Sequence, residues 1–385
     1  MFFRNRHRVG AATRRAGAGV LIGVAVLLAF AQPGAVAEQA CTTARFPALD
    51  HGFNLTGWFD EAKPRPPSRA TLAQLRRLGM HHVRLTIAAD SVVADFAGAG
   101  AVSAKVAAID AAIDLLLKLD YAVIVDLHSS DKLFAMLRAD PVQGQARVTE
   151  AWRALAPLFK PGRSGRLYAE LLNEPPLEGT DWAAMQAALL PQLRALLPTT
   201  PLILSTGGPQ RVEKLTASEP AADKNVLYAV HFYDPFYFTH QGADWIDDVP
   251  GISALRDMPF PVVPGSKRLA LTAAELRLAG QTGLADKLAG LTQPYGETDV
   301  AQAMQALADW SRRTGAPVII DEFGVYGGRA VKADRIHWLE TVVGAAQANC
   351  LGWTHWEFRD GFGFVDPDSG KPDPELTKAL LGRSP

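Results

Sequence analysis

The sequence predicts an α/β fold, a single (β/α)8 TIM barrel with an enlarged loop after strand 6. Eight short β-rich runs alternate with amphipathic stretches along the 385 residues, and strands that alternate with helices predict a parallel sheet with right-handed crossovers. A doubly wound sheet is the main alternative, but no Gly-rich phosphate turn follows the first run, as that fold would require. With 48% hydrophobic and 21% charged residues, the composition is that of a globular protein with a large core.

The predicted elements follow one another in the order that a barrel requires. Strands are expected at residues 52–58, 82–87, 122–128, 167–174, 201–207, 226–233, 317–323 and 351–358. Apolar residues at helical spacing predict helices at 68–79, 102–120, 181–197, 300–315 and 332–348. Because barrels of this kind carry their chemistry on the loops after each strand, we expect the site at the carboxyl ends of the strands.

The first 37 residues have the pattern of a signal peptide. Five arginines precede the apolar run GVLIGVAVLLAF, and small residues end the segment at Ala37, where we expect cleavage. The apolar run is shorter than the roughly 20 residues of a membrane-spanning helix, which disfavours an uncleaved anchor. Removing five arginines from a net charge of −1 leaves −6, a poor surface for nucleic acid or anionic lipid. We therefore expect a secreted or periplasmic catalytic domain at residues 38–385, monomeric and without stable membrane association.

One connection is far longer than the others. Residues 234–316 separate the sixth predicted strand from the seventh, and loops of that length are usually functional. The stretch from Thr298 to Gly315 predicts the crossover helix. The part before it is rich in aromatic residues, among them Phe236, Tyr237 and Trp245, and we expect it to lie over the active face.

Polar and aromatic side chains gather at the carboxyl ends of the predicted strands. They are Arg84 in the second strand, His128 in the third, Asn173 and Glu174 in the fourth, His231 and Tyr233 in the sixth, Glu322 in the seventh and Trp356 in the eighth. In a barrel these ends surround one mouth. A carboxyl pair in such a cleft commonly cleaves a glycosidic bond, since one group protonates the leaving oxygen while the other attacks the anomeric carbon or activates a water.

Seven segments in order resemble glycoside hydrolase family 5, the cellulase family. They are GFNLTGWF, GMHHVRLTI, VIVDLH, ELLNEP, VHFY, IIDEFG and WTHWEF, and they extend over nearly all of the mature region. The resemblance implies that Glu174 is the general acid/base, held protonated at rest by the charge nearby. It implies that Glu322 is the nucleophile, kept anionic by Arg84 and by the hydroxyl of Tyr233.

The same resemblance implies supporting roles for the other strand-end residues. Asn173 would bind the sugar 2-hydroxyl, His128 and His231 would bind sugar hydroxyls and orient the carboxylates, and Trp356 would form the floor under the ring that is cleaved. Trp356 could instead be core filler, and the aromatic residues of the long loop could stack on sugars or pack the loop itself. Either glutamate could instead cap a following helix.

Three further acids are expected to have structural positions. Glu170 should be a paired acid inside the barrel, and Asp126 should lie one layer below His128. Asp321 should point away from the mouth, because it alternates with Glu322 along its strand.

The two cysteines are expected to form a disulfide. Cys41 lies just before the first strand and Cys350 just before the last, and these strands are neighbours in a closed barrel. A bridge in an exported protein would pin the amino terminus to the bottom of the barrel; two separate buried thiols are the alternative. We expect neither a metal nor a cofactor, because no histidine pair at helical spacing and no cysteine pair suggests a ligand set.

The function that the strand-end residues and the family resemblance together imply is retaining, endo-acting hydrolysis of a β-glucan, with internal β-1,4 cleavage. Exo-acting β-glucosidases or β-1,3-glucanases, β-mannanases and exopolysaccharide hydrolases are alternatives in the same family. A non-catalytic carbohydrate-binding barrel is an alternative of another class, against which the presence of both glutamates counts. A metal-dependent barrel hydrolase is a third class, and it predicts that chelation abolishes activity.

Overall fold

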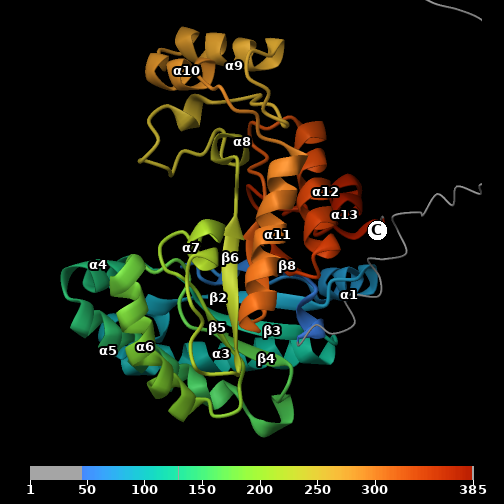
Figure 1. Cartoon of the computed structure of the whole chain (residues 1–385). Helices are drawn as coiled ribbons and strands as arrows, with labels where there is room; N and C mark the ends of the chain where they lie inside the picture. Colours follow the sequence, from blue (N-terminus) through green and yellow to red (C-terminus); the bar gives the residue numbers. More distant parts are fainter. Residues whose placement is uncertain (1–45, 129, 384–385) are drawn as a thin grey trace, which may run out of the picture.

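The computed structural model describes residues 46–128 and 130–383, and its eight parallel strands close into a barrel (Figure 1). The strand order follows the sequence, and β8 pairs with β1, where Gly52 lies opposite Thr354. The strands are β1 (His51–Phe59), β2 (His82–Ala88), β3 (Ala122–His128), β4 (Leu167–Glu170), β5 (Leu202–Leu204), β6 (Val226–Phe232), β7 (Val318–Phe323) and β8 (Gly352–His355). The prediction of a (β/α)8 barrel is confirmed.

Helices surround the barrel and also form part of the long connection after β6. They are α1 (Arg69–Leu78), α2 (Ala94–Ala97), α3 (Ala99–Lys118), α4 (Asp131–Ala139), α5 (Pro141–Leu155), α6 (Gly179–Leu196), α7 (Val212–Thr216), α8 (Phe236–Thr239), α9 (Lys267–Leu278), α10 (Thr282–Ala289), α11 (Glu297–Thr314), α12 (Lys332–Ala348) and α13 (Pro374–Leu381). The five predicted helices correspond to α1, α3, α6, α11 and α12. Their ends are set by local signals: Ser68 accepts a hydrogen bond from the Thr71 N–H at the start of α1, and Gly79, with a φ of 114°, ends it.

The fourth strand is shorter than predicted. It ends at Glu170, although the apolar run in the sequence continues to Leu172. Glu174 has a φ of 37°, a left-handed conformation that no strand residue adopts. Asn173 and Glu174 therefore lie on the loop after β4, where they can turn towards the mouth.

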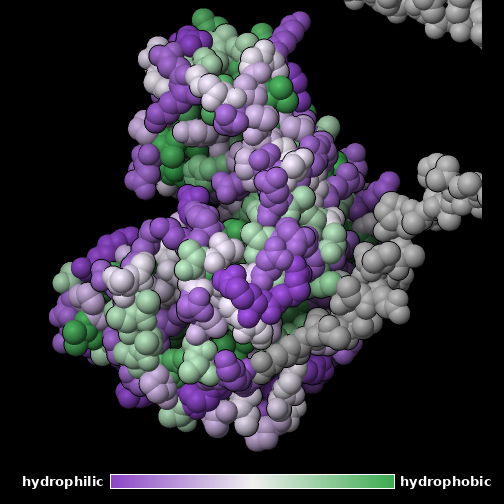
Figure 2. All heavy atoms as spheres, in the orientation of Figure 1, coloured by the Kyte–Doolittle hydropathy of each residue, from purple (hydrophilic) through white to green (hydrophobic). Residues whose placement is uncertain are grey.

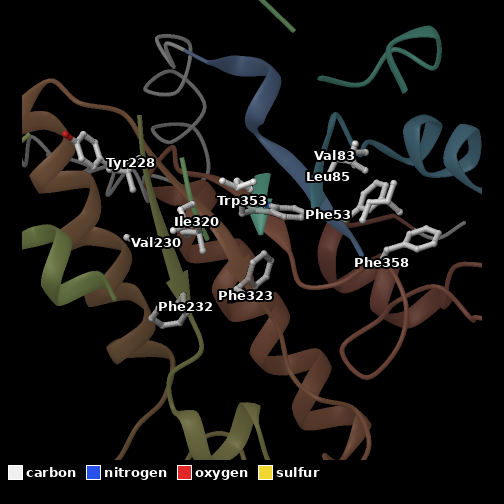
Figure 3. Close-up of a cluster of buried hydrophobic side chains, with 14 of the residues drawn as sticks. Phe53, Val83, Leu85, Tyr228, Val230, Phe232, Ile320, Phe323, Trp353 and Phe358 are labelled. Atoms are coloured by element: carbon white, nitrogen blue, oxygen red, sulfur yellow. The ribbon is translucent and has the colours of Figure 1, made fainter. Parts of the chain in front are cut away.

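Two apolar clusters hold the barrel. The larger one packs outward-facing strand residues against the helices, and Figure 3 draws part of it, including Phe53, Phe232 and Phe323. The smaller one alternates with the first along the strands and fills the lower barrel interior; it contains Leu49, Ala122, Ile124, Tyr168, Ile203, Leu227, Ala229 and Ile319. Between this cluster and the carboxyl ends of the strands, polar side chains fill the barrel interior.

The long connection after β6 forms a separate layer, residues 234–296, which we call the excursion. Figure 1 shows α9 and α10 side by side and clear of the barrel, beyond the end to which β6 points, and α11 returning along the barrel wall. Gln241 fixes the path of the excursion, because its amide accepts from the Met258 N–H and donates to the Phe238 carbonyl. Figure 2 shows the surface hollowed between the excursion and the barrel body. The excursion thus lies beyond the carboxyl end of β6, at the end of the barrel where the site is expected.

Several predictions concern residues 1–45, which lie outside the described residues. They include the signal peptide, its cleavage after Ala37, and Cys41. Cys350 lies between α12 and β8, and its bridge to Cys41 stays a prediction. Within the described part of the chain, no helix combines the length and the apolar character needed to cross a bilayer.

Candidate active site

The mouth of the barrel holds a cavity of about 630 Å³. Its lining includes His128, Asn173, Glu174, Tyr233, Glu322 and Trp356, from the ends of β3, β4, β6, β7 and β8. A second cavity of about 250 Å³ adjoins it and includes His231. The two cavities share Glu174, Tyr233, His240 and Trp245. The structure thus brings the strand-end residues together in one cleft with room on both sides of Glu174.

Glu322 is held by three groups. Arg84 donates from Nη1 to Oε1 over 2.8 Å, and the Tyr233 hydroxyl donates to Oε2 over 3.0 Å. The His231 Nδ1 lies 3.5 Å from the same Oε2. These three contacts fix the position of the Glu322 carboxyl group at the mouth of the barrel.

Glu174 is paired with His231, whose Nδ1 donates to Oε1 over 2.8 Å. Burial alone would raise the pKa of Glu174, but the hydrogen bond and charge of His231 outweigh it, and the pKa lies below its ordinary value. Burial works against a charged imidazole as well, yet the charge of Glu322 and the hydrogen bond of Glu174 raise the pKa of His231 to about 9. The prediction that Glu174 is protonated at rest is therefore wrong. The proton resides on His231, one hydrogen bond away.

His231 also bridges the two glutamates. One carboxylate oxygen of Glu174, one of Glu322 and a ring nitrogen of His231 all lie within 4.8 Å of one another. A set of two carboxylates and an imidazole could hold a divalent cation. The hydrogen bonds that these atoms make already account for their arrangement.

Arg84 is the centre of the polar layer beneath the cleft. Its Nε and Nη2 donate to the two carboxylate oxygens of Glu170 over 2.6 and 2.7 Å, and Nη2 also donates to the Asn173 Oδ1 over 2.7 Å. Nη1 is shared between Glu322 and the Asn54 Oδ1. One fully buried guanidinium thus fixes the nucleophile candidate and Asn173 together, and Glu170 is the paired interior acid that the sequence predicts.

Strand alternation predicted that Asp321 points away from the mouth, and this prediction is wrong. In β7, His231 lies opposite Glu322 while Val230 lies opposite Ile320, so one extra residue is inserted. This bulge turns both Asp321 and Glu322 inward, and Asp321 lies 3.5 Å from His231 and 3.7 Å from Arg84. Burial, with the nearby charge of Glu170, raises the pKa of Asp321 well above its ordinary value.

His128 and Trp356 form one wall of the cleft. His128 donates from Nδ1 to Asp126 Oδ2 over 2.6 Å, so Asp126 lies one layer below it as expected. The imidazole stacks on the indole of Trp356 with ring centres 5.6 Å apart and an angle of 12° between planes. Trp356 lines the larger cavity, which places an aromatic face at the cleft instead of in the core.

The excursion contributes two of its three candidate aromatic residues to the cleft. Trp245 is 53% exposed, lines both cavities and packs edge-on against Tyr326. Phe236 lines the smaller cavity and stacks on His240. Tyr237 packs against the large apolar cluster and lines neither cavity. The structure therefore does not bring Tyr237 to the site.

Sequence reasoning missed several cleft residues, of which Glu357 is the most distinctive. It lines the larger cavity, accepts a hydrogen bond from the Thr56 hydroxyl over 2.7 Å, and burial raises its pKa to about 8. Its position directly after Trp356 in WTHWEF was a usable signal. Tyr326, Asp360 and Phe362 also line this cavity, but they lie on loops whose course no sequence pattern indicates.

A (β/α)8 barrel with two carboxylates, a bridging histidine and an aromatic wall at its mouth defines a barrel glycoside hydrolase. The profile of the family described as Cellulase (glycosyl hydrolase family 5) matches residues 41–360, and the chain belongs to that family. This confirms the resemblance found in the sequence.

Several relatives are named endoglucanases, at low sequence identity. The chain is 22% identical over 277 residues to Endoglucanase 3 of Fibrobacter succinogenes, which covers 71% of this chain and 41% of that protein. It is 27% identical over 213 residues to Endoglucanase C of Acetivibrio thermocellus, a match that covers 50% of this chain and 60% of that protein. The match therefore spans about half the length of these relatives. The crystal structure of endoglucanase Cel5A from Thermotoga maritima has the same fold, with a TM-score of 0.69 and 23% identity over 87% of this chain and 97% of that one.

Proposed function

We propose that the chain is a retaining endo-β-1,4-glucanase in which Glu174 is the acid/base and Glu322 the nucleophile. The observation that carries this proposal is the approach of the two carboxylates, whose oxygens lie within 4.8 Å across the cleft. Retaining glycosidases hold their carboxyl groups about 5–5.5 Å apart, whereas inverting enzymes leave about 6.5–9.5 Å for a water.

In the first step a Glu322 oxygen attacks the anomeric carbon, and the bond from that carbon to the leaving oxygen breaks. Glu174 gives its proton to the leaving oxygen. Because Glu174 is ionised in the free protein, the proton must first pass from His231 Nδ1 to Glu174 Oε1, across their 2.8 Å hydrogen bond. Arg84 and Tyr233 hold Glu322 in place and ease its departure from the glycosyl ester later.

In the second step Glu174 takes a proton from a water, whose oxygen attacks the same anomeric carbon. The ester bond to Glu322 breaks, and the product leaves with its original anomeric configuration. Asn173, whose Oδ1 accepts a hydrogen bond from Arg84, lines the larger cavity at the mouth and would meet the sugar 2-hydroxyl there. His128 and Trp356 offer a polar edge and an aromatic face to the same sugar.

The internal mode of cleavage is supported by space on both sides of Glu174. The larger cavity, with Trp356, suits the sugar that becomes covalently bound, and the smaller one, with Phe236, suits the leaving chain. Trp245, which lines both, is an exposed stacking surface. The relatives named as endoglucanases favour a β-1,4-glucan as the substrate. A polysaccharide substrate fits the proposed export of the chain, for which residues 1–37 would be the signal peptide. The enzyme would act as a monomer.

A substrate screen tests the proposal. Soluble β-1,4-glucan, β-1,3-glucan, mannan and cello-oligosaccharides are digested, and product sizes are followed over time. Early release of mixed-length products from β-1,4-glucan is expected. Release of glucose alone would favour an exo-acting enzyme, preference for another polymer would reassign the substrate, and binding without hydrolysis would favour the non-catalytic alternative. Loss of activity in a chelator would favour the metal-dependent alternative.

Two substitutions test the assigned roles. Glu322→Gln should abolish hydrolysis. Glu174→Ala should regain turnover of an activated aryl cellobioside in azide, with a β-glycosyl azide as product, because azide attacks the glycosyl ester where water no longer has a base. Glu340→Gln, an exposed acid on α12, is the matched control and should keep full activity. An active Glu322→Gln protein would refute the nucleophile assignment.

A further inference from the structure

Gln210 connects the two members of the Glu174–His231 pair. It lies between β5 and α7 and is fully buried. Its side-chain Oε1 accepts from the Glu174 N–H over 2.9 Å, and its backbone carbonyl accepts from the His231 N–H over 3.0 Å. A single residue thus holds both backbones whose side chains share the catalytic proton.

The loop of Gln210 is joined to the loop of Glu174 over several residues. The Gly208 N–H donates to the carbonyls of Pro175 and Leu177 over 2.9 and 3.0 Å, and Glu178 pairs with Gly207. Gln210 and Glu174 both have left-handed backbones, with φ of 49° and 37°. Such a conformation costs about 1–2 kcal/mol for a residue with a Cβ, so it needs neighbouring contacts to persist, and the bond to Gln210 Oε1 is such a contact.

The Nε2 group of the Gln210 amide makes no hydrogen bond to a described residue that would stabilise the fold. Because Oε1 must face the Glu174 N–H, the orientation of the amide is fixed, and its Nε2 is buried without a hydrogen-bond partner among the described residues. A buried donor left unpaired costs about 1–3 kcal/mol. An apolar side chain would avoid this cost but would lose the acceptor for Glu174.

We propose that Gln210 is a positioning residue that aims the Glu174 carboxyl at the glycosidic oxygen and keeps it in register with His231. The proposal rests on the acid/base role proposed for Glu174. If the Glu174 backbone relaxes, the carboxyl moves relative to the leaving oxygen, and a displacement of about 1 Å can reduce a rate by about 100-fold. Attack by Glu322 on a substrate that needs no proton should be almost unaffected.

Leaving-group dependence tests this proposal. Gln210→Met removes the acceptor at nearly constant volume, and Gln210→Asn keeps an amide that is too short to reach. On phenyl β-cellobioside, whose leaving group needs protonation, both variants should lose about 10- to 100-fold in kcat/KM. On 2,4-dinitrophenyl β-cellobioside they should stay within about threefold of the wild type. Gln210→Glu, measured at about pH 5.5 where burial keeps the new carboxyl neutral, should recover most of the phenyl activity.

Gln186→Met is the matched control, because Gln186 also accepts from a backbone N–H, that of Ser205, but belongs to α6 outside the cleft. It should leave both rates unchanged. Equal losses on both substrates in the Gln210 variants, or no loss on either, would overturn the proposal. Failure of the proposed function is separate: the wild type would then not cleave the dinitrophenyl substrate, or Glu174→Gln would lose activity equally on both substrates. Should Gln210→Met not fold, the Asn and Glu variants give the same comparison.

Discussion

Replacing His231 with Gln should remove a pH-dependent part of the stability of the fold. The side chain is 1% exposed, and its cationic form is stabilised by Glu322, Glu174 and Asp321, although burial opposes it. Its pKa is about 9 in the folded protein and 6.5 ordinarily. At about 1.36 kcal/mol per pH unit, this difference corresponds to about 3 kcal/mol.

The sign follows from the raised pKa. The folded protein holds this proton more tightly than the unfolded chain does, so the contribution is complete below pH 6.5 and is lost as the pH rises through about 9. Glu174 contributes in the opposite sense, because its pKa is lowered, but only below its ordinary value of 4.5. A window from about pH 5.5 to about pH 10 therefore spans the titration of His231 and lies above the ordinary pKa of Glu174.

The assay is urea unfolding of the wild type and His231→Gln across that window. The difference between their free energies of unfolding should fall by about 3 kcal/mol from the acid to the alkaline end. His337→Gln is the control, because it breaks a largely exposed contact with Glu297, where an ion pair contributes little. A difference between wild type and His231→Gln that is constant over the window would refute the assigned protonation of the pair.

Further predictions concern neighbouring residues. In alkaline solution kcat/KM should fall with an apparent pKa near 9, because the Glu174–His231 pair must keep one proton; a pH profile checks this. Arg84→Lys keeps the charge but not the two-armed contact with Glu170, so it should lower the free energy of unfolding by about 3 kcal/mol and kcat/KM by about 100-fold. Trp356→Ala should raise KM and lower kcat/KM about 30-fold, through loss of about 2 kcal/mol of stacking, without a comparable loss of stability. Glu357→Gln should become more stable than the wild type by up to about 5 kcal/mol as the pH rises from 4.5 to 8, since the wild type must ionise a buried acid; denaturation at both pH values measures this.

The alternation of strands and helices predicted the barrel because each element must bury one face. The spacing of apolar residues along the sequence therefore indicates which elements are strands and which are helices. The strand ends predicted the cleft for a related reason: parallel strands in a barrel all deliver their last residues to one side. Glu322, His231 and Glu174 could therefore be brought together without knowledge of any distance between them.

Features that depend on single insertions or on contacts across the barrel were not predictable. A regular period of two placed Asp321 outside, whereas the bulge opposite His231 places it inside. The protonation of Glu174 depends on a histidine 57 residues away. Gln210 is in a loop without periodicity, and its role depends on a backbone donor of another loop. Tyr237 shares its helical turn with Phe236 but faces the core, which composition alone cannot tell.

The buried charges explain why protons reside where the proposed reaction needs them. Glu170, Asp321 and Glu322 surround Arg84, which offers only one permanent positive charge. An interior cannot hold so many anions against one cation, so protons are retained. The raised pKa values of Glu170 and Asp321, chiefly from burial, express this excess of acid.

The same excess acts on the histidines. Burial lowers the pKa of His128, but Asp126 raises it by more, and His231 is raised by Glu322, Glu174 and Asp321 in the same way. A proton is thereby kept beside Glu174 at pH values where an isolated imidazole would have lost it. The polar layer costs stability that an apolar interior would keep, and in return it supplies a cationic donor 2.8 Å from the proposed catalytic acid. The bulge in β7 is part of this arrangement, because it adds Asp321 to the acids that face His231.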